Sequence, residues 1–455
     1  MNVMKTTVFA GSLMMCASAL ATATYTYEND NKTYVATVTD NETDISQAAI
    51  DVLDADTVTN FVVCGTKRLH VDKGSSFTGD VCLNTSVRLS APNSLGVGPG
   101  QIYVTTNKIT MSGGTVDKAV TFNTLGLWGE QSGIGVWGAP AGATPYVGVF
   151  KKKVTFDGGG LNIYPYVRSQ LVFEGGLEGS GCIAFREMAG GTITFTNVPV
   201  KFTHGYPASA QNGVGTPDST GFSRHIIFAV AGNSMTRFSH PTYPFSLGEL
   251  KTTVDYAFNN TSMYMCFGHD SKWDLCGTTQ CVGQIQSEVK TGNPTVVTNS
   301  SSKTATLYLG MMYGPSSTLP NIRFAGNLSV VFNKNIWETK INHPMTATGD
   351  LVILGNGGGG ENSAILNFME NGSWANATNV VVDGVGKMKI ANPNALGKKT
   401  HLSLKSNSSL EISSGVTVTV RTLTVNGVQQ PVGDYTFGSG TLHVTGKPGL
   451  IMCIK

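Results

Sequence analysis

The chain has 455 residues, of which 55 are glycine, 13% are charged and 40% are hydrophobic. Average chains have about 7% glycine and about 25% charged residues, so this composition excludes intrinsic disorder and disfavours a helical bundle or coiled coil. The formal net charge is +2, which leaves no basic footprint for nucleic acid or anionic lipid. We therefore expect a β-rich protein with a weakly charged surface.

Residues 1–23 have the pattern of a signal peptide. Lys5 provides a short positive region, the run 8–20 is apolar, and Ala21 and Ala23 are the small residues that a cleavage site needs. We expect cleavage after Ala23, with cleavage after Ala21 as the alternative. The apolar run is too short to cross a bilayer and no later stretch replaces it, so no transmembrane segment is expected. The leader predicts a secreted or cell-surface protein, with the bacterial envelope as the favoured location.

Residues 24–202 contain short runs in which every second residue is apolar, with Gly, Asn or Asp between the runs. Examples are QIYVTTNKITM, KAVTFN and GTITFTN. Alternation with a period of two is typical of strands that bury one face. The run 45–55 has the best helical spacing, and it predicts a short helix that caps the N-terminal part of a β-solenoid.

Residues 203–292 have a different composition. Prolines, aromatic residues, cysteines and four of the eight histidines gather there, so we expect an irregular lobe inserted into the solenoid. Strand alternation returns in 293–446, where pairs of apolar residues follow each other at steps of about six to eight residues. This spacing favours a parallel β-solenoid over the alternative, an antiparallel sandwich. Residues 447–455 are expected to cap the C-terminal end.

The most distinctive motif lies in 386–446. Its matching residues are Gly386 to Asn394, then Leu423, Val425, Asn426, Gly427, Gly433 and Tyr435, then Gly438, Gly440, Leu442 and Val444. This pattern resembles the passenger-associated strand repeats of bacterial autotransporter-like proteins. The resemblance implies a right-handed parallel β-helix, exposed outside the cell for adhesion or display, and it transfers no catalytic residue to this chain. Because GLIMCIK directly follows the last expected coil, we expect a barrel-less relative of that family.

Seven cysteines remain after the leader. Disulfides are the expected state of cysteine pairs in an exported protein. Proximity in the sequence suggests two pairs, and the candidates are Cys64 with Cys82, and two of Cys266, Cys276 and Cys281. The same three cysteines and His269 have a spacing that a zinc site can use, which is the less favoured alternative.

The loop 268–274 holds the best cluster of chemically active side chains. Glycoside cleavage needs a pair of acid and base groups, so His269, Asp270 and Asp274 are the candidate catalytic residues if the protein is an enzyme. Trp273 in the same loop is a candidate for stacking on a sugar ring. We favour the interpretation of this segment as a polar loop held by the neighbouring cysteines, and outside the enzyme alternative no catalytic residue is expected.

Aromatic residues near expected turns offer another route to glycan binding. Tyr164 and Tyr166, together with Trp128 and Trp137, are candidates for a flat platform on the solenoid flank, and packing in the core or at a corner is the alternative for each. Apart from the less favoured zinc spacing, no metal site is expected, and no cofactor is expected. The sequence thus predicts a structural, adhesive or glycan-binding surface protein whose partner is a glycan or a protein. A polysaccharide lyase or glycoside hydrolase is the alternative.

Overall fold

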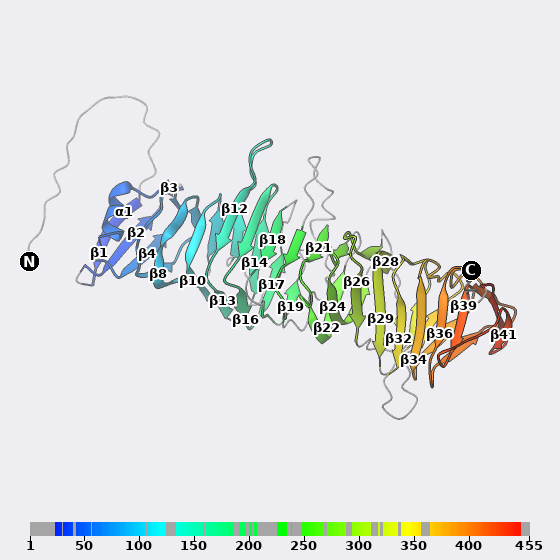
Figure 1. Cartoon of the computed structure of the whole chain (residues 1–455). Helices are drawn as coiled ribbons and strands as arrows, with labels where there is room; N and C mark the ends of the chain where they lie inside the picture. Colours follow the sequence, from blue (N-terminus) through cyan, green and yellow to red (C-terminus); the bar gives the residue numbers. More distant parts are fainter. Residues whose placement is uncertain are drawn as a thin grey trace, which may run out of the picture.

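The computed structural model is a long rod of stacked coils (Figure 1). It describes residues 23–446 apart from 30, 40–41, 56, 106, 124–132, 158–159, 186–190, 197–199, 203, 207–224, 234–237, 239–247, 268–270, 288–293, 311–316, 319–321, 335–337 and 356–364. The chain is nearly all-β and forms a parallel β-solenoid of about 14 turns. The predicted fold class is therefore confirmed, and the antiparallel sandwich is not formed.

The first sheet has seventeen strands and runs along the rod from its N-terminal end. Its strands pair in parallel, with the exception of β1, which pairs antiparallel with β2. They are β1 (Ala23–Glu28), β2 (Thr33–Val38), β4 (Asn60–Gly65), β6 (Asp80–Leu83), β8 (Pro92–Thr105), β10 (Thr115–Asn123), β12 (Tyr146–Phe150), β13 (Val154–Asp157), β15 (Ser169–Phe173), β16 (Leu177–Gly179), β18 (Thr192–Phe195), β20 (His225–Phe228), β21 (Glu249–Thr252), β23 (Lys272–Asp274), β25 (Thr295–Thr298), β28 (Ile322–Gly326) and β31 (Thr346–Ala347).

Two further sheets complete most of the coils. The eight-stranded sheet serves the N-terminal half and contains β3 (Thr43–Asp44), β5 (Leu69–Val71), β7 (Val87–Leu89), β9 (Lys108–Met111), β11 (Gly133–Val136), β14 (Gly160–Pro165), β17 (Cys182–Phe185) and β19 (His204–Tyr206). The nine-stranded sheet serves the C-terminal half and contains β22 (Asn259–Phe267), β24 (Thr279–Ser287), β26 (Ala305–Leu309), β29 (Leu328–Lys334), β32 (Leu351–Gly355), β34 (Asn379–Gly384), β36 (His401–Leu404), β39 (Thr422–Val425) and β40 (Val428–Gln429).

The last coils use two smaller sheets. A five-stranded sheet contains β27 (Ser317–Thr318), β30 (Glu338–Ile341), β33 (Ile365–Phe368), β35 (Lys387–Ile390) and β37 (Ser409–Ile412). A three-stranded sheet contains β38 (Thr417–Val420), β41 (Gly433–Phe437) and β42 (Gly440–Val444). The segment 386–446, which carries the family resemblance, thus forms the final coils and the C-terminal end of the rod.

The core follows from the alternation of apolar residues. On most strands every second side chain points inward, and register pairing places like residues above one another, as for Val380, Leu402 and Leu423 on three successive coils. All three are buried. Each such side chain contributes about 1.5–3 kcal/mol by leaving water, so the alternation both selects the strand and stabilises the stack.

A ladder of phenylalanines inside the rod crosses the segment predicted as an irregular lobe. Phe150, Phe173, Phe195 and Phe228 stack with ring centroids 5.5, 5.2 and 5.1 Å apart in that order. Phe228 belongs to 203–292, where β20, β21 and β23 continue the parallel ladder of the first sheet. The solenoid therefore runs through this segment.

One inward position of β10 holds a lysine. Lys118 follows the alternation of Val116 and Val120 and is fully buried. Its Nζ donates a hydrogen bond to the carbonyl oxygen of Gly79 and lies 4.4 Å from the centroid of the Phe77 ring. Burial lowers the pKa of Lys118 to about 8, against the opposing attraction of a nearby aspartate.

Both ends of the core are covered. At the N-terminal end, the helix α1 (Gln47–Leu53) lies close to the predicted position, with Ser46 Oγ accepting a hydrogen bond from the backbone N–H of Ala49. At the C-terminal end, β40 and β41 pair antiparallel with β39 and β42. The cap predicted at 447–455 lies outside the described residues. In the part of the chain that the structure describes, no helix is long and apolar enough to span a membrane.

Candidate functional site

The segment 268–274 is predicted to be a loop with catalytic and sugar-stacking residues, but most of its described part is the strand β23. His269 and Asp270 lie outside the described residues, whereas Trp273 and Asp274 belong to β23. Trp273 is completely buried, and its Nε1 donates a hydrogen bond to Thr252 Oγ1 at 3.3 Å. The prediction that Trp273 stacks on a sugar is therefore wrong, because the ring points inward and fills the core beside Phe258.

Asp274 anchors the turn that follows β23. Its Oδ1 accepts hydrogen bonds from the backbone N–H groups of Cys276 and Ser300, both at 3.0 Å, and Lys272 Nζ lies 3.8 Å from Oδ2. Burial raises the pKa of Asp274, but hydrogen bonds from Ser300 and Cys276 and the charge of Lys272 outweigh it and lower the pKa. A carboxylate held ionised in this way is a poor proton donor, which weakens its candidacy as a catalytic acid.

The cysteine pairs predicted from sequence proximity are not joined by disulfides. Cys64 and Cys82 are free thiols. Val62 pairs with Cys82, so Cys64 is displaced by two residues along the neighbouring strand. One strand spacing and two residues together separate the Cα atoms by about 8 Å, beyond the about 7 Å that a disulfide can bridge.

The pairing predicted between two of Cys266, Cys276 and Cys281 is not formed either. Cys276 and Cys281 are free thiols. Cys266 is opposite Gln286, which places it five residues along the strands from Cys281 and about 17 Å away. Burial raises the pKa of both the Cys276 and Cys281 thiols. No group of three His, Cys, Asp or Glu side chains that could hold a metal ion occurs in the part of the chain that the structure describes.

Three of the four aromatic residues predicted as a platform do lie together. Trp137 stacks on Tyr166 with ring centroids 6.1 Å apart and an interplanar angle of 27°, and Tyr164 meets Tyr166 edge-on at 5.9 Å. Trp137 is 40% exposed, whereas Tyr164 is buried and packs against Tyr166. Trp128 lies outside the described residues.

Two arginines complete this cluster. Arg68 and Arg88 each place the guanidinium carbon 5.5 Å from the centroid of the Trp137 ring. The carboxylate of Glu42 holds both, with Oε2 3.4 Å from Arg68 Nη1 and Oε1 3.0 Å from Arg88 Nη1. We call the group formed by Arg68, Arg88, Trp137, Tyr164 and Tyr166 the Trp137 surface.

The eight-stranded sheet brings the Trp137 surface together. Arg88, Thr110, Gly135 and Tyr164 pair in register on β7, β9, β11 and β14, so the four positions form one row across the sheet. A Cβ atom at Gly135 would lie 2.1 Å from Tyr164 Cε2, so only glycine lets the tyrosine ring lie flat on β11. The flat ring then supports the Tyr166 and Trp137 stack.

The Trp137 surface combines a partly exposed indole with fixed positive charge. Lys108 Nζ lies 5.7 Å from the centroid of the Tyr164 ring, so three cations lie around the aromatic rings. The carboxylate of Glu42 offsets part of their positive charge. An aromatic face binds the apolar side of a ring, and guanidinium groups donate hydrogen bonds to hydroxyl or carboxylate oxygens. The sequence pattern did not indicate Glu42, Arg68 and Arg88, because only coil stacking brings them to Trp137.

Comparison with protein-family models, with curated proteins and with solved structures finds no match to this chain. The geometry of the described residues is therefore the basis for a functional hypothesis.

Proposed function

We propose that this protein is an exported β-solenoid that binds glycans at a cell surface through the Trp137 surface. The observation that carries the proposal is the exposed indole of Trp137, stacked on Tyr166 and bordered by two arginines that Glu42 holds in place. Because Glu42 and Tyr166 fix the neighbouring groups before a ligand arrives, little side-chain entropy is lost on binding.

The indole and the two arginines would contact different parts of a bound sugar. A sugar ring would contact the exposed part of the Trp137 indole, and Arg68 and Arg88 would donate hydrogen bonds to its oxygens. Aromatic contacts of this kind contribute about 0.5–1.5 kcal/mol each, so one site binds weakly and repeated contacts along a polymer would add avidity.

The test is binding to immobilised plant, mucin and bacterial polysaccharides, with release of new sugar ends scored in the same tubes. We expect the wild-type protein to be retained without cleavage, and Trp137→Ala to weaken retention about tenfold, the equivalent of about 1.4 kcal/mol. Tyr103→Ala is the matched control, since Tyr103 is 41% exposed on another sheet. Equal loss in both variants, or no retention of the wild type, would contradict the proposal.

The proposed location rests on the leader pattern of residues 1–23. The first described strand, β1, begins at Ala23, so cleavage after Ala23 would leave the rest of that strand at the new N-terminus. Kinship with the autotransporter-like repeat proteins is part of the same proposal and is supported by the motif in 386–446. Secretion with loss of the leader, measured by N-terminal sequencing of the extracellular protein, tests the location.

The alternative of a polysaccharide lyase or glycoside hydrolase has less support. Of its three candidate residues, Asp274 is buried and bound to backbone N–H groups. His269 and Asp270 lie outside the described residues. Release of new sugar ends in the binding assay would favour this alternative and make Asp270→Ala the first variant to examine.

A further inference from the structure

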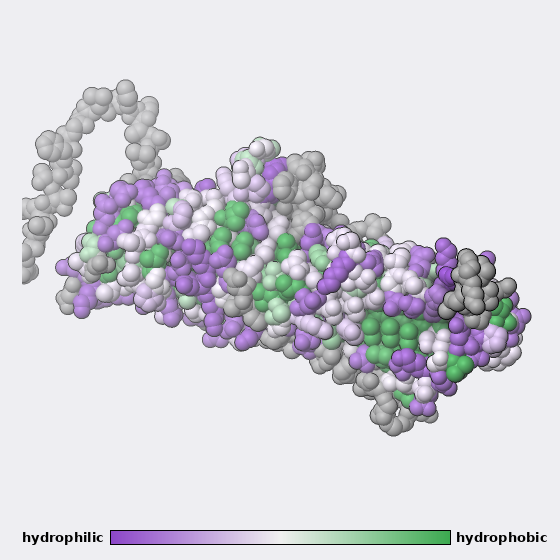
Figure 2. Space-filling view, viewed as in Figure 1, coloured by the Kyte–Doolittle hydropathy of each residue, from purple (hydrophilic) through white to green (hydrophobic). Residues whose placement is uncertain are grey.

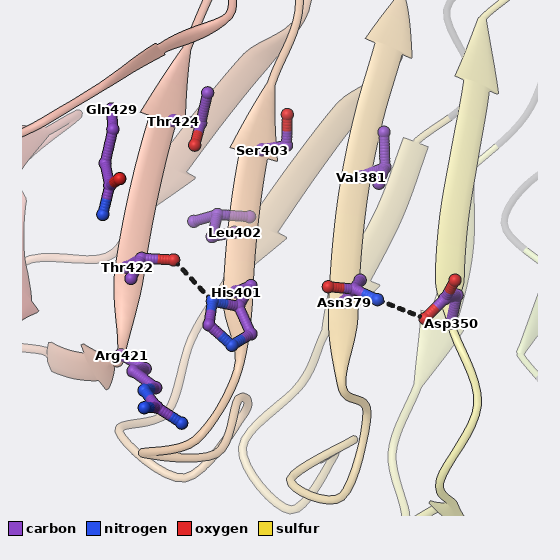
Figure 3. A pocket seen from close by; sticks show the side chains of 10 residues that line it. All are labelled: Asp350, Asn379, Val381, His401, Leu402, Ser403, Arg421, Thr422, Thr424 and Gln429. Atoms are coloured by element: carbon purple, nitrogen blue, oxygen red, sulfur yellow. Dashed lines mark hydrogen bonds between the residues drawn. The ribbon is translucent and has the colours of Figure 1, made fainter. Parts of the chain in front are cut away.

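A polar pocket lies on the nine-stranded sheet near the C-terminal end of the rod (Figure 3). Its volume is about 700 Å³. Two rows of outward side chains form its base. The first row contains Asp350, Asn379, His401 and Thr422, and the second contains Val381, Ser403, Thr424 and Gln429.

A hairpin bounds the pocket at one end. Thr424 on β39 pairs with Gln429 on β40, and the connecting residues Asn426 and Gly427 have φ values of 52° and 80°. Positive φ at both positions is the geometry of a tight two-residue turn, which the Asn-Gly sequence favours. The turn brings Gln429 beside the row of Ser403 and Thr424, as Figure 3 shows.

The first row is ordered by its own hydrogen bonds. Asn379 Nδ2 donates to Asp350 Oδ1 at 2.7 Å, and His401 Nδ1 lies 2.7 Å from Thr422 Oγ1 (Figure 3). These bonds fix the four side chains and, among the residues that the structure describes, leave the second carboxylate oxygen of Asp350, the amide oxygen of Asn379 and Nε2 of His401 for other contacts. The row therefore offers both acceptors and a ring nitrogen to a ligand rich in hydroxyl groups.

Charge is distributed unevenly along the pocket. Arg421 lies on the β39 side, and within the described residues its guanidinium has neither an ion pair nor a hydrogen bond. Asp350 lies at the other end, three strand spacings or about 14 Å away. A ligand with a carboxylate at one end and hydroxyl groups over that length complements this arrangement, because guanidinium binds carboxylate through paired N–H donors.

The pocket also borders an apolar area. Val331, Val352 and Val381 pair in register on β29, β32 and β34. Figure 2 shows a hydrophobic patch on the face over these strands. A pyranose ring has an apolar face of C–H groups and a rim of hydroxyl groups, so it can contact valine while its rim reaches the polar row.

We propose that this pocket binds a short acidic oligosaccharide, with the carboxylate of one sugar at Arg421 and the hydroxyl groups of the next sugars at the row from Thr422 to Asp350. About 14 Å accommodates two to three sugar residues. The inference goes beyond the proposed function and does not depend on it, since the Trp137 surface lies on coils of the N-terminal half.

The test is calorimetric titration of the purified full-length protein with two trisaccharides of the same linkage, β-1,4-linked glucuronic acid and β-1,4-linked glucose. We expect the acidic trisaccharide to bind at least about tenfold more tightly, because only it carries a carboxylate for Arg421. Arg421→Gln should remove that preference and leave the weak affinity for the neutral trisaccharide unchanged. Gln429→Ala, at an exposed position on the hairpin, should lower the affinity for both trisaccharides.

Two control variants show whether the preference arises in this pocket. Lys303→Gln removes an exposed cation on another coil and should change nothing, which excludes a general charge effect. The titrations are repeated in Trp137→Ala, which removes binding at the Trp137 surface, so the affinity and the preference that remain belong to this pocket and failure of the proposed function is distinguishable from failure of this inference. Equal affinity for the two trisaccharides, undetectable binding of both, or a preference that survives in Arg421→Gln would overturn the inference.

Discussion

Replacing the buried Lys118 with methionine should change how the stability of the rod depends on pH. The folded state lowers the pKa of Lys118 from 10.5 to about 8 because burial disfavours the charged form. Between these two values the unfolded chain binds more protons than the folded one, so folding stability rises with pH across that window. Methionine has a similar length and shape and no charge.

The size of the effect follows from the shift. About 2.5 pKa units at about 1.36 kcal/mol each make a cost of about 3 kcal/mol, fully present below pH 8 and absent above about pH 10.5. The methionine variant loses the hydrogen bond from Nζ to Gly79, which costs about 1–3 kcal/mol at every pH. The net difference at pH 7 is therefore small, but its dependence on pH is not. Relative to the variant, the wild type should gain about 2 kcal/mol between pH 7.5 and 9.5.

Urea unfolding followed by circular dichroism at pH 7.5, 8.5 and 9.5 measures this difference. The comparison cancels other groups that titrate in this range, including the thiols of Cys82 and Cys281, whose pKa burial raises. Lys303→Met, at an exposed position, is the matched control and should follow the wild type. Parallel stability curves for the wild type and Lys118→Met would refute the reasoning.

Four other outcomes are expected. Gly135→Ala should displace Tyr164, lowering both glycan retention and the melting temperature, with a cost of about 1–3 kcal/mol measured by urea unfolding. Asp274→Asn should destabilise the protein at neutral pH by about 1.5–3 kcal/mol. Because folding lowers the pKa of Asp274, the difference in stability should disappear as the pH falls from the ordinary pKa of an aspartate to this lowered pKa, measured by acid titration of the two proteins. Phe195→Ala removes one ring of the internal ladder and should cost about 3–5 kcal/mol in urea unfolding. Asn299→Ala removes two amide hydrogen bonds to backbone carbonyls at a buried corner and should lower the melting temperature measurably more than the exposed control Asn376→Ala.

The fold was predictable from the sequence because alternation is a local property. Most strands of the solenoid show their buried face in the alternation of their own residues, as KAVTFN does for β10. The same pattern also contained Lys118 at an inward position, but a lysine in a strand is normally expected to be exposed. Its burial depends on the Gly79 carbonyl and the Phe77 ring, which come from an earlier coil.

The candidate site was predictable only in part. Tyr166 and Trp137 were identified because aromatic residues near turns are conspicuous, whereas Trp273 was misjudged because its polar neighbours in the sequence suggested a surface loop. The pocket at Arg421 and Asp350 had no signal in the sequence. Its two rows exist because coils of similar length place residues from four strands side by side, and small changes in coil length decide that alignment.

The reversed strands at both ends of the rod give the molecule a defined length. A further coil, or a second copy placed end to end, would have to continue a parallel ladder with its slanted and evenly spaced hydrogen bonds. Instead, β1 at one end and β40 and β41 at the other run against their neighbours. The backbone groups of these three strands thus present the wrong spacing for a continuing parallel coil. A chain whose interior repeats along one axis is thereby hindered from growing into a filament through these edges.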